Sequence, residues 1–144
     1  MSETPPPVAA LAHAYAQWNA TRGASGDLFL DLMAPDISMR TLLNPPELHP
    51  LAQERIGIEN ARGYLDSLVL NLEMVEFPTE EIVAQGNTVV WIGSCHWRCP
   101  RTGREAKTAK VDVWRFADGR AVSVMEMFDT IGFARINSLK LELA

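Results

Sequence analysis

The chain has 144 residues, of which 47% are hydrophobic and 22% are charged, proportions that exclude a wholly disordered protein. Its length fits one domain whose core needs no metal or disulfide for stability. The formal charge of −5 argues against nucleic acid as a partner. No apolar run reaches the roughly 20 residues of a membrane helix, and the start of the chain lacks a secretory signal, so we expect a cytoplasmic protein that does not bind membranes.

The first half of the chain has the hydrophobic spacing of helices. Residues 1–7 are a proline-rich tail that we expect to be disordered. From Val8 to Trp18, apolar residues recur at helical intervals, which predicts a first helix. Asp27 is a suitable cap for a short second helix, and residues 57–72 repeat the helical spacing for a third.

A strand and a loop are predicted between the second and third helices. Residues 37–41 alternate between apolar and polar side chains, as a half-buried strand does. Residues 44–51 are rich in proline and form a predicted loop. Within this loop, His49 is either an ordinary loop residue or part of a lid over a pocket.

The second half of the chain has the period of two that is typical of strands. The predicted strands are residues 73–84, 88–99, 105–116 and 121–130. Residues 134–144 are expected to form a C-terminal tail. Helices followed by such an antiparallel meander indicate an α+β fold, in which the helices cover one face of the sheet.

Alternation along the strands predicts which side chains face the core. A hairpin turning at Thr102-Gly103 sets Trp97 opposite Thr108 and Cys95 opposite Lys110. The predicted inward set is Trp91, Cys95, Trp97, Lys110, Asp112 and Trp114, with His96 outward. Two ionisable side chains therefore lie among tryptophans, which is costly unless they are paired or functional.

Cys95 and Cys99 are the two cysteines of the chain. On one strand their Cα atoms lie roughly 13 Å apart, whereas a disulfide requires about 5.5 Å. A zinc site needs about four ligands, and only His96 is close in sequence. We expect two free thiols.

Several short segments, taken in order, resemble the SnoaL-like, ketosteroid-isomerase-like branch of the NTF2-like superfamily over roughly residues 8–133. The segments are Tyr15 to Trp18, Gly26-Asp27, Ala34-Pro35-Asp36-Ile37, Arg55-Ile56-Gly57-Ile58-Glu59, Val111 to Phe116, Asp118-Gly119-Arg120 and Glu126 to Thr130. The resemblance implies an α+β cone, with a strongly curved, mostly antiparallel sheet of about six strands wrapped around three N-terminal helices. It also implies a pocket that opens at one end, and a homodimer formed through the outer face of the sheet.

The resemblance carries over to particular residues only in part. Tyr15 and Asp112 match the oxyanion-hole tyrosine and aspartic acid of ketosteroid isomerases. Thr41 matches the position of their general base, so steroid isomerisation by that route is not expected. Glu126 matches the last-strand acid of limonene-epoxide-hydrolase relatives, whose Arg-x-Asp pair falls here on Gly93 and Cys95. SnoaL-type cyclases rely chiefly on one strand acid, which corresponds to Asp112.

We therefore predict a pocket for a hydrophobic polyketide-, steroid- or terpenoid-like small molecule. If the protein is an enzyme, the resemblance implies a cofactor-free isomerase, cyclase or hydrolase that acts by proton transfer. The predicted catalytic residues are Asp112, Tyr15 and Glu126, and the predicted ligand-binding residues are Trp18, Met39, Thr41, Trp97, Lys110, Trp114 and Phe128. No nucleotide-binding or metal-ligand motif is present, so neither a cofactor nor a metal is expected.

Three alternatives remain open. Asp112 is either functional or the structural ion-pair partner of Lys110. Lys110 either anchors a ligand anion or acts as the counter-ion of Asp112. The competing function class is a non-catalytic binding module for a hydrophobic small molecule. A protein-interaction adaptor is the third class, since one fold hosts many functions.

Overall fold

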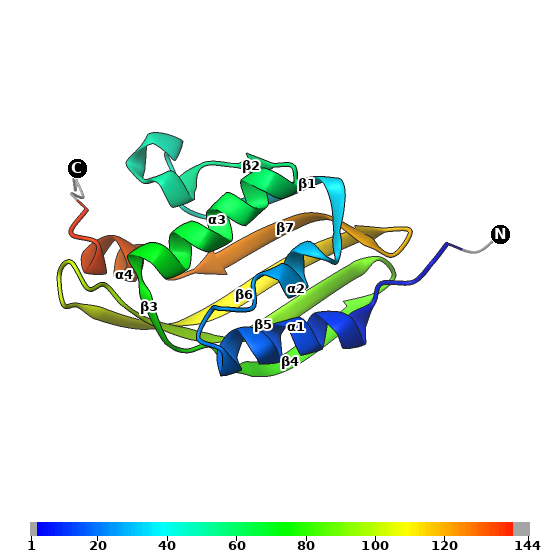
Figure 1. Ribbon diagram of the computed structural model, residues 1–144, viewed down its shortest axis with the longest axis horizontal. Coiled ribbons are helices and arrows are strands. Elements are labelled where there is room, and N and C mark those ends of the chain that lie inside the picture. The colour runs from blue at the N-terminus through cyan, green and yellow to red at the C-terminus, as the bar shows by residue number, and fades with distance from the viewer. Residues whose placement is uncertain (1–2, 140–144) are drawn as a thin grey trace.

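The computed structural model describes residues 3–139, in which a curled sheet wraps around helices (Figure 1). The helices are α1 (Val8–Ala20), α2 (Asp27–Leu30), α3 (Ile58–Asn71) and α4 (Thr130–Ile136), with 3-10 turns at Pro46–Leu48 and Pro50–Ala52. The strands are β1 (Met33–Thr41), β2 (Arg55–Ile56), β3 (Glu73–Glu76), β4 (Thr79–Gln85), β5 (Thr88–Arg98), β6 (Glu105–Ala117) and β7 (Arg120–Phe128).

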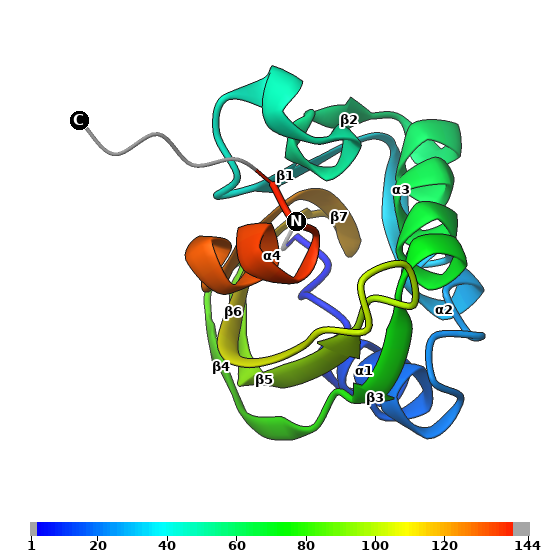
Figure 2. The ribbon, with the colours of Figure 1, turned by 90° about the vertical axis from the view of Figure 1, so that its left-hand side faces the viewer.

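The sheet has the order β2-β1-β7-β6-β5-β3, with β4 also paired to β5. Strands β1 and β7 run parallel, and the other pairs are antiparallel. Figure 2, which looks at the sheet from one end, shows its strong curl, with α1, α2 and α3 on its inner side. Helix α4 lies across that end (Figure 2). The expected α+β cone is therefore confirmed.

The alternation of strands β5 and β6 places the predicted side chains inward. Trp91, Trp97 and Trp114 are buried, while His96 keeps a quarter of its side chain exposed and contacts Glu105 on the outer face. Both cysteines are buried free thiols, as expected.

The register of the β5–β6 hairpin differs from the prediction by two residues. Trp97 pairs with Ala106 and Cys95 with Thr108, instead of with Thr108 and Lys110. The cause is the turn: Cys99 exchanges backbone hydrogen bonds with Gly103 and Arg104, so the turn is centred on Arg101-Thr102 instead of on Thr102-Gly103. A shift of two leaves every side chain on its predicted face, because the strand period is also two.

The strand predicted over residues 73–84 is divided at Phe77-Pro78. Proline has no N–H for the ladder, and both β3 and β4 pair with β5 on either side of this break. The free N–H of Phe77 donates to Asn19 Oδ1 of α1 at 2.7 Å. The break turns the Phe77 ring into the core, where it stacks on Trp91.

Both ends of the described chain pack on the domain. Glu3 accepts hydrogen bonds from Asn87 and from the backbone N–H of Asp118, within the tail expected to be disordered. Helix α4 runs to Ile136, so the boundary expected at residue 133 falls inside a helix whose Ala134 and Ile136 are buried. Residues 1–2 and 140–144, the rest of the two expected tails, lie outside the described part of the chain.

Candidate functional site

A cavity of about 70 Å³ lies between the inner face of the sheet and the helices. Most of its lining is apolar and aromatic, contributed by α1, α2, α3, α4 and the strands. The polar part of the wall consists chiefly of Tyr15, Tyr64, Lys110, Asp112 and Glu126. A mostly apolar cavity with a few converging polar groups is the usual form of a small-molecule site.

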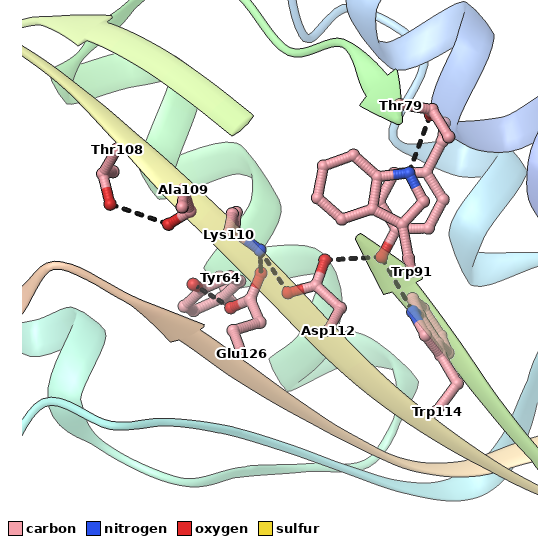
Figure 3. A network of polar contacts seen from close by, with 10 residues as sticks. Tyr64, Thr79, Trp91, Thr108, Ala109, Lys110, Asp112, Trp114 and Glu126 are labelled. Carbon is pink, nitrogen blue, oxygen red and sulfur yellow. Dashed lines mark hydrogen bonds and ion pairs between the residues drawn. The ribbon is translucent and has the colours of Figure 1, made fainter. Parts of the chain in front are cut away.

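The centre of the polar wall is an ion-pair cluster on strands β6 and β7 (Figure 3). Asp112 and Glu126 are direct cross-strand partners, and Lys110 precedes Asp112 by two residues on the same face. Lys110 Nζ contacts Asp112 Oδ1 and also donates to Glu126 Oε1 at 3.1 Å. All three residues are less than a tenth exposed. One buried ammonium thus serves two buried carboxylates.

A tyrosine binds each carboxylate on the side away from Lys110. The Tyr15 hydroxyl donates to Asp112 Oδ2 at 2.5 Å and accepts a hydrogen bond from Trp114 Nε1 at 2.8 Å. The Tyr64 hydroxyl, from α3, donates to Glu126 Oε2. We call these five residues, Tyr15, Asp112, Lys110, Glu126 and Tyr64, the polar cluster.

Aromatic packing fixes the Tyr15 end of the polar cluster. The Tyr15 ring stacks on Trp91 with centroids 4.4 Å apart, and Trp91 Nε1 donates to Thr79 Oγ1 at 2.7 Å. Lys110 Nζ lies 5.3 Å from the centroid of Phe77, a cation–π distance. The hydroxyl of Tyr15 and the ammonium of Lys110 are therefore both held by rings that cannot move freely in a packed core.

Gly93 makes room for this packing. A Cβ at this position would lie 2.3 Å from the carbonyl oxygen of Pro78 and 2.6 Å from the ring of Trp91. Because Gly93 has no side chain, the Trp91 ring can lie along strand β5 and reach Tyr15.

Burial and the close ion pairs together set the electrostatics of the polar cluster. Burial and the neighbouring Glu126 carboxylate raise the pKa of Asp112 to about 6, although Lys110 acts in the opposite direction. Burial alone would lower the pKa of Lys110, but Asp112 and Glu126 outweigh it and raise that pKa above the ordinary value. Burial and the adjacent carboxylates raise the pKa of both tyrosines well above 10, so both remain hydrogen-bond donors.

The structure brings together nearly all of the side chains predicted for the site. The predicted apolar ligand-binding residues that line the cavity are Trp18, Met39, Trp97, Trp114 and Phe128. Thr41 is not in the lining, because its hydroxyl bonds to backbone groups of Leu43 and Leu51. Cys95 also faces the cavity, and burial raises its pKa to about 11, so it is a protonated thiol.

Tyr64 is the one member of the polar cluster that the sequence analysis did not identify. Its signal was present: Tyr64 lies three residues after Ala61 and four before Leu68, on the buried stripe of α3. A hydroxyl on an apolar stripe requires a buried partner, and Glu126 is that partner.

Helix α4 forms one wall of the cavity through Phe133 and Ile136. Three side chains of the β5–β6 loop bond to carbonyl oxygens at its C-terminal end: Thr102 to Ile136, Arg101 to Asn137 and Arg104 to Arg135. His49 does not line the cavity, but its ring packs edge-on against Phe133 at 5.2 Å. His49 thus packs against the α4 wall without lining the cavity itself.

Within residues 3–139, no three His, Cys, Asp or Glu side chains converge as metal ligands do. No helix in the same described range is long and apolar enough to cross a membrane.

The sequence profile of the SnoaL-like domain matches residues 11–124, most of the chain. The chain belongs to the SnoaL-like family. No functionally curated protein is significantly similar to it in a sequence comparison.

Solved structures confirm the NTF2-like fold of this SnoaL-like protein. An NTF2-like protein of unknown function from Burkholderia pseudomallei is 21% identical, with a TM-score of 0.75 over 90% of this chain and 95% of its own. TerC, crystallised with polyporic acid, is 22% identical, with a TM-score of 0.74 over 91% and 97%. A proposed SnoaL-like polyketide cyclase from a Jannaschia species is 18% identical, with a TM-score of 0.71 over 92% of each chain. At these identities the likeness concerns the fold.

Proposed function

We propose that this SnoaL-like protein catalyses cofactor-free proton transfer on a hydrophobic small molecule bound in the cavity, with Asp112 as the acid and base. The observation that carries the proposal is the position of the Asp112 carboxyl: it faces an apolar cavity, is 2% exposed, and is held by Tyr15 and Lys110. A pKa raised to about 6 by burial leaves a carboxylate that is ionised at neutral pH and basic enough to accept a proton.

In the proposed reaction, the Asp112 carboxylate removes a proton from a C–H bond beside a ligand carbonyl. The electron pair stays on the ligand as an enolate, with its charge on oxygen. The neutral Asp112 carboxyl, whose proton exchanges with solvent in part of the turnovers, then returns a proton to another atom of the enolate, so the ligand is isomerised and nothing else is consumed. This is the class of chemistry that isomerases and cyclases need from a single carboxyl group.

Tyr15 and Lys110 support this step by their hydrogen bonds. While Asp112 is ionised, the Tyr15 hydroxyl donates to it and holds its orientation. When Asp112 takes up a proton, the Tyr15 hydroxyl loses its carboxylate acceptor and can donate to the enolate oxygen instead. The Lys110 ammonium remains close to the developing negative charge, which it stabilises in a low-dielectric cavity.

The size of the cavity bears on the ligand. Pockets for drug-sized ligands usually measure about 300–1,000 Å³, several times the volume of about 70 Å³ found here. A polyketide-, steroid- or terpenoid-like ligand therefore requires the cavity to widen, and in our proposal the α4 wall moves outward, which breaks the bonds from Arg101, Thr102 and Arg104. The co-crystal of TerC with polyporic acid supports the idea that this fold admits organic ligands.

A non-catalytic binding module is the second candidate. It is favoured by Thr41, which stands where ketosteroid isomerases have a base and whose hydroxyl is bonded to backbone in this fold. Because Thr41 cannot act as a base, Asp112 and Glu126 are the carboxyl groups of the polar cluster that remain for proton transfer.

Solvent exchange of ligand protons separates the two candidates. The probe is 2-hydroxyacetophenone in D₂O, which has an aromatic ring, a carbonyl group and acidic C–H bonds. We expect the protein to accelerate deuterium incorporation measured by NMR, and Asp112→Asn to abolish the acceleration. Asp36→Asn removes an exposed carboxylate of β1 and is the matched control. Binding of the probe without accelerated exchange would favour the binding module.

We also propose a homodimer formed through the outer face of the sheet and a cytoplasmic location. Half-buried apolar residues, Val90, Ile92, Val111, Val113, Met125 and Met127, lie on that face. Two buried unbonded thiols fit a reducing compartment. Light scattering should give twice the chain mass of 16.0 kDa, and Val111→Glu should give the single mass. A wild-type mass of one chain would contradict the dimer.

A further inference from the structure

The charges that line the cavity are unbalanced. Lys110 is the one basic side chain in the lining of the described cavity, whereas Asp112, Glu126 and Asp129 contribute three carboxyl groups. Lys110 contacts two of these carboxyl groups directly, so its charge is already shared. With both contacted carboxylates ionised, the polar cluster has a formal charge of −1.

Hydrogen-bonding capacity is unbalanced in the same direction. The two carboxylates of the polar cluster offer about eight lone-pair sites, and four hydrogen bonds from Tyr15, Tyr64 and Lys110 occupy about half of them. The hydrogens of both tyrosine hydroxyls are used in these bonds, and the indole N–H of Trp114 is used on Tyr15. The polar cluster therefore has about four acceptor sites to spare but only one spare donor, the third N–H of Lys110.

From this imbalance we propose that the cavity selects apolar ligands that present a neutral hydrogen-bond donor, such as a hydroxyl or enol group, and rejects carboxylates. The inference rests on the proposed function, because it names the ligand class of the same site: the substrate presents such a donor in addition to its reacting carbonyl group. Lys110 is then not an anchor for a ligand anion. Asp112 and Glu126 are the specificity-determining residues, because together they neutralise Lys110 and repel a further negative charge.

The geometry also explains why a donor binds better than an acceptor. A hydroxyl placed against Asp112 or Glu126 forms a charge-assisted hydrogen bond with an oxygen that has a lone pair free. A ketone oxygen in the same place meets carboxylate oxygens, and in the polar cluster only the third N–H of Lys110 is left for it to accept. A carboxylate adds repulsion from two buried negative charges in a medium of low dielectric constant.

Three probes of equal size test the proposal: 1-phenylethanol, a donor; acetophenone, an acceptor only; and benzoate, an anion. Binding is followed by the NMR shifts of the indole N–H groups of Trp114 and Trp97, which line the cavity. We expect 1-phenylethanol to bind roughly tenfold more tightly than acetophenone and benzoate to bind most weakly. Equal affinities, or tightest binding of benzoate, would overturn the proposal and leave the proposed function standing. No shift with any probe would overturn both.

A double variant tests the role of the two carboxylates by gain of binding. Asp112→Asn with Glu126→Gln keeps the shape of the wall and leaves Lys110 as a lone cation, so benzoate affinity should rise at least about tenfold. Asp36→Asn with Glu80→Gln makes the same change of net charge at exposed positions and should leave benzoate affinity unchanged. If the double variant does not fold, Glu126→Gln alone should weaken the rejection of benzoate. Unchanged affinity for benzoate in a folded variant would overturn the proposal.

Discussion

Asp112 and Glu126 face each other across strands β6 and β7, and their carboxylates contact the same ammonium group, that of Lys110. With both carboxylates ionised, this cluster of three charges has a formal charge of −1. A proton added to either acid makes the cluster of three charges formally neutral. Burial and the neighbouring carboxylate raise the pKa of Asp112 to about 6, which gives this residue a physical reason to exchange a proton near neutral pH.

The pH dependence of stability should carry the signature of Asp112. Its pKa is raised to about 6 in the folded state from an ordinary value near 3.8, so the folded protein binds this proton more tightly. The contribution of Asp112 to stability is then fully present below about pH 4 and is lost as pH rises through 6, by up to about 3 kcal/mol. Urea denaturation between pH 4 and 7 should show this loss in wild type relative to Asp112→Asn. Parallel pH profiles of the two proteins would contradict it.

Lys110→Met should be strongly destabilising at pH 7.5, because it leaves two buried carboxylates without a cation. We expect a loss of about 3–5 kcal/mol in unfolding free energy, which partly recovers at pH 5 as Asp112 takes up a proton. Lys107→Met on the same strand removes an exposed ion pair with Glu76 and should cost less than about 1 kcal/mol. Equal losses for the two variants would show that the Lys110 ion pairs do not stabilise the fold.

The two tyrosines of the polar cluster should differ in their contributions. Tyr64→Phe removes one hydrogen bond to a carboxylate and should cost about 1.5–3 kcal/mol. Tyr15→Phe removes such a bond and also leaves the Trp114 N–H without its acceptor, so it should cost more. Chemical denaturation of both variants measures the difference. A smaller loss for Tyr15→Phe would mean that its two hydrogen bonds are not both formed.

Gly93→Ala should disturb the packing of Trp91, which supports the polar cluster. The new methyl group would meet the Pro78 carbonyl and the Trp91 ring, so we expect a loss of about 1–3 kcal/mol and a change in tryptophan fluorescence. Gly63→Ala in α3 is the matched control: its methyl group lies 3.7 Å from Arg55, an ordinary contact, and should stabilise the helix by up to about 1 kcal/mol. A neutral Gly93→Ala would contradict the close packing of Trp91.

The sequence was sufficient to predict which face of each central strand is buried, because alternation alone determines it. Lys110 and Asp112 were therefore placed correctly beside the tryptophans, even though the hairpin register was wrong by two residues. Register depends on the loop after Cys99, whose backbone hydrogen bonds leave no mark in a hydrophobic pattern. Pro78 cannot donate to the ladder and so signals the break between β3 and β4, but the prediction ran one strand through it.

Contacts between distant segments were harder to predict than faces. Tyr64 reaches Glu126 across 62 residues of sequence, and only the folded chain shows that the α3 stripe lies over β7. Thr41 shows the opposite case. The resemblance predicted it as a pocket residue, but in the folded chain its hydroxyl bonds to nearby backbone groups.

The titration of Asp112 tests the central claim most directly. Carbon-13 labelling of aspartate, with Asp112→Asn to assign the resonance, gives the protonation of this carboxyl by NMR as a function of pH. The proposed acid and base chemistry predicts a midpoint near 6. A midpoint below 4 for Asp112 would describe a permanently ionised partner of Lys110 and would contradict the proposed catalytic role.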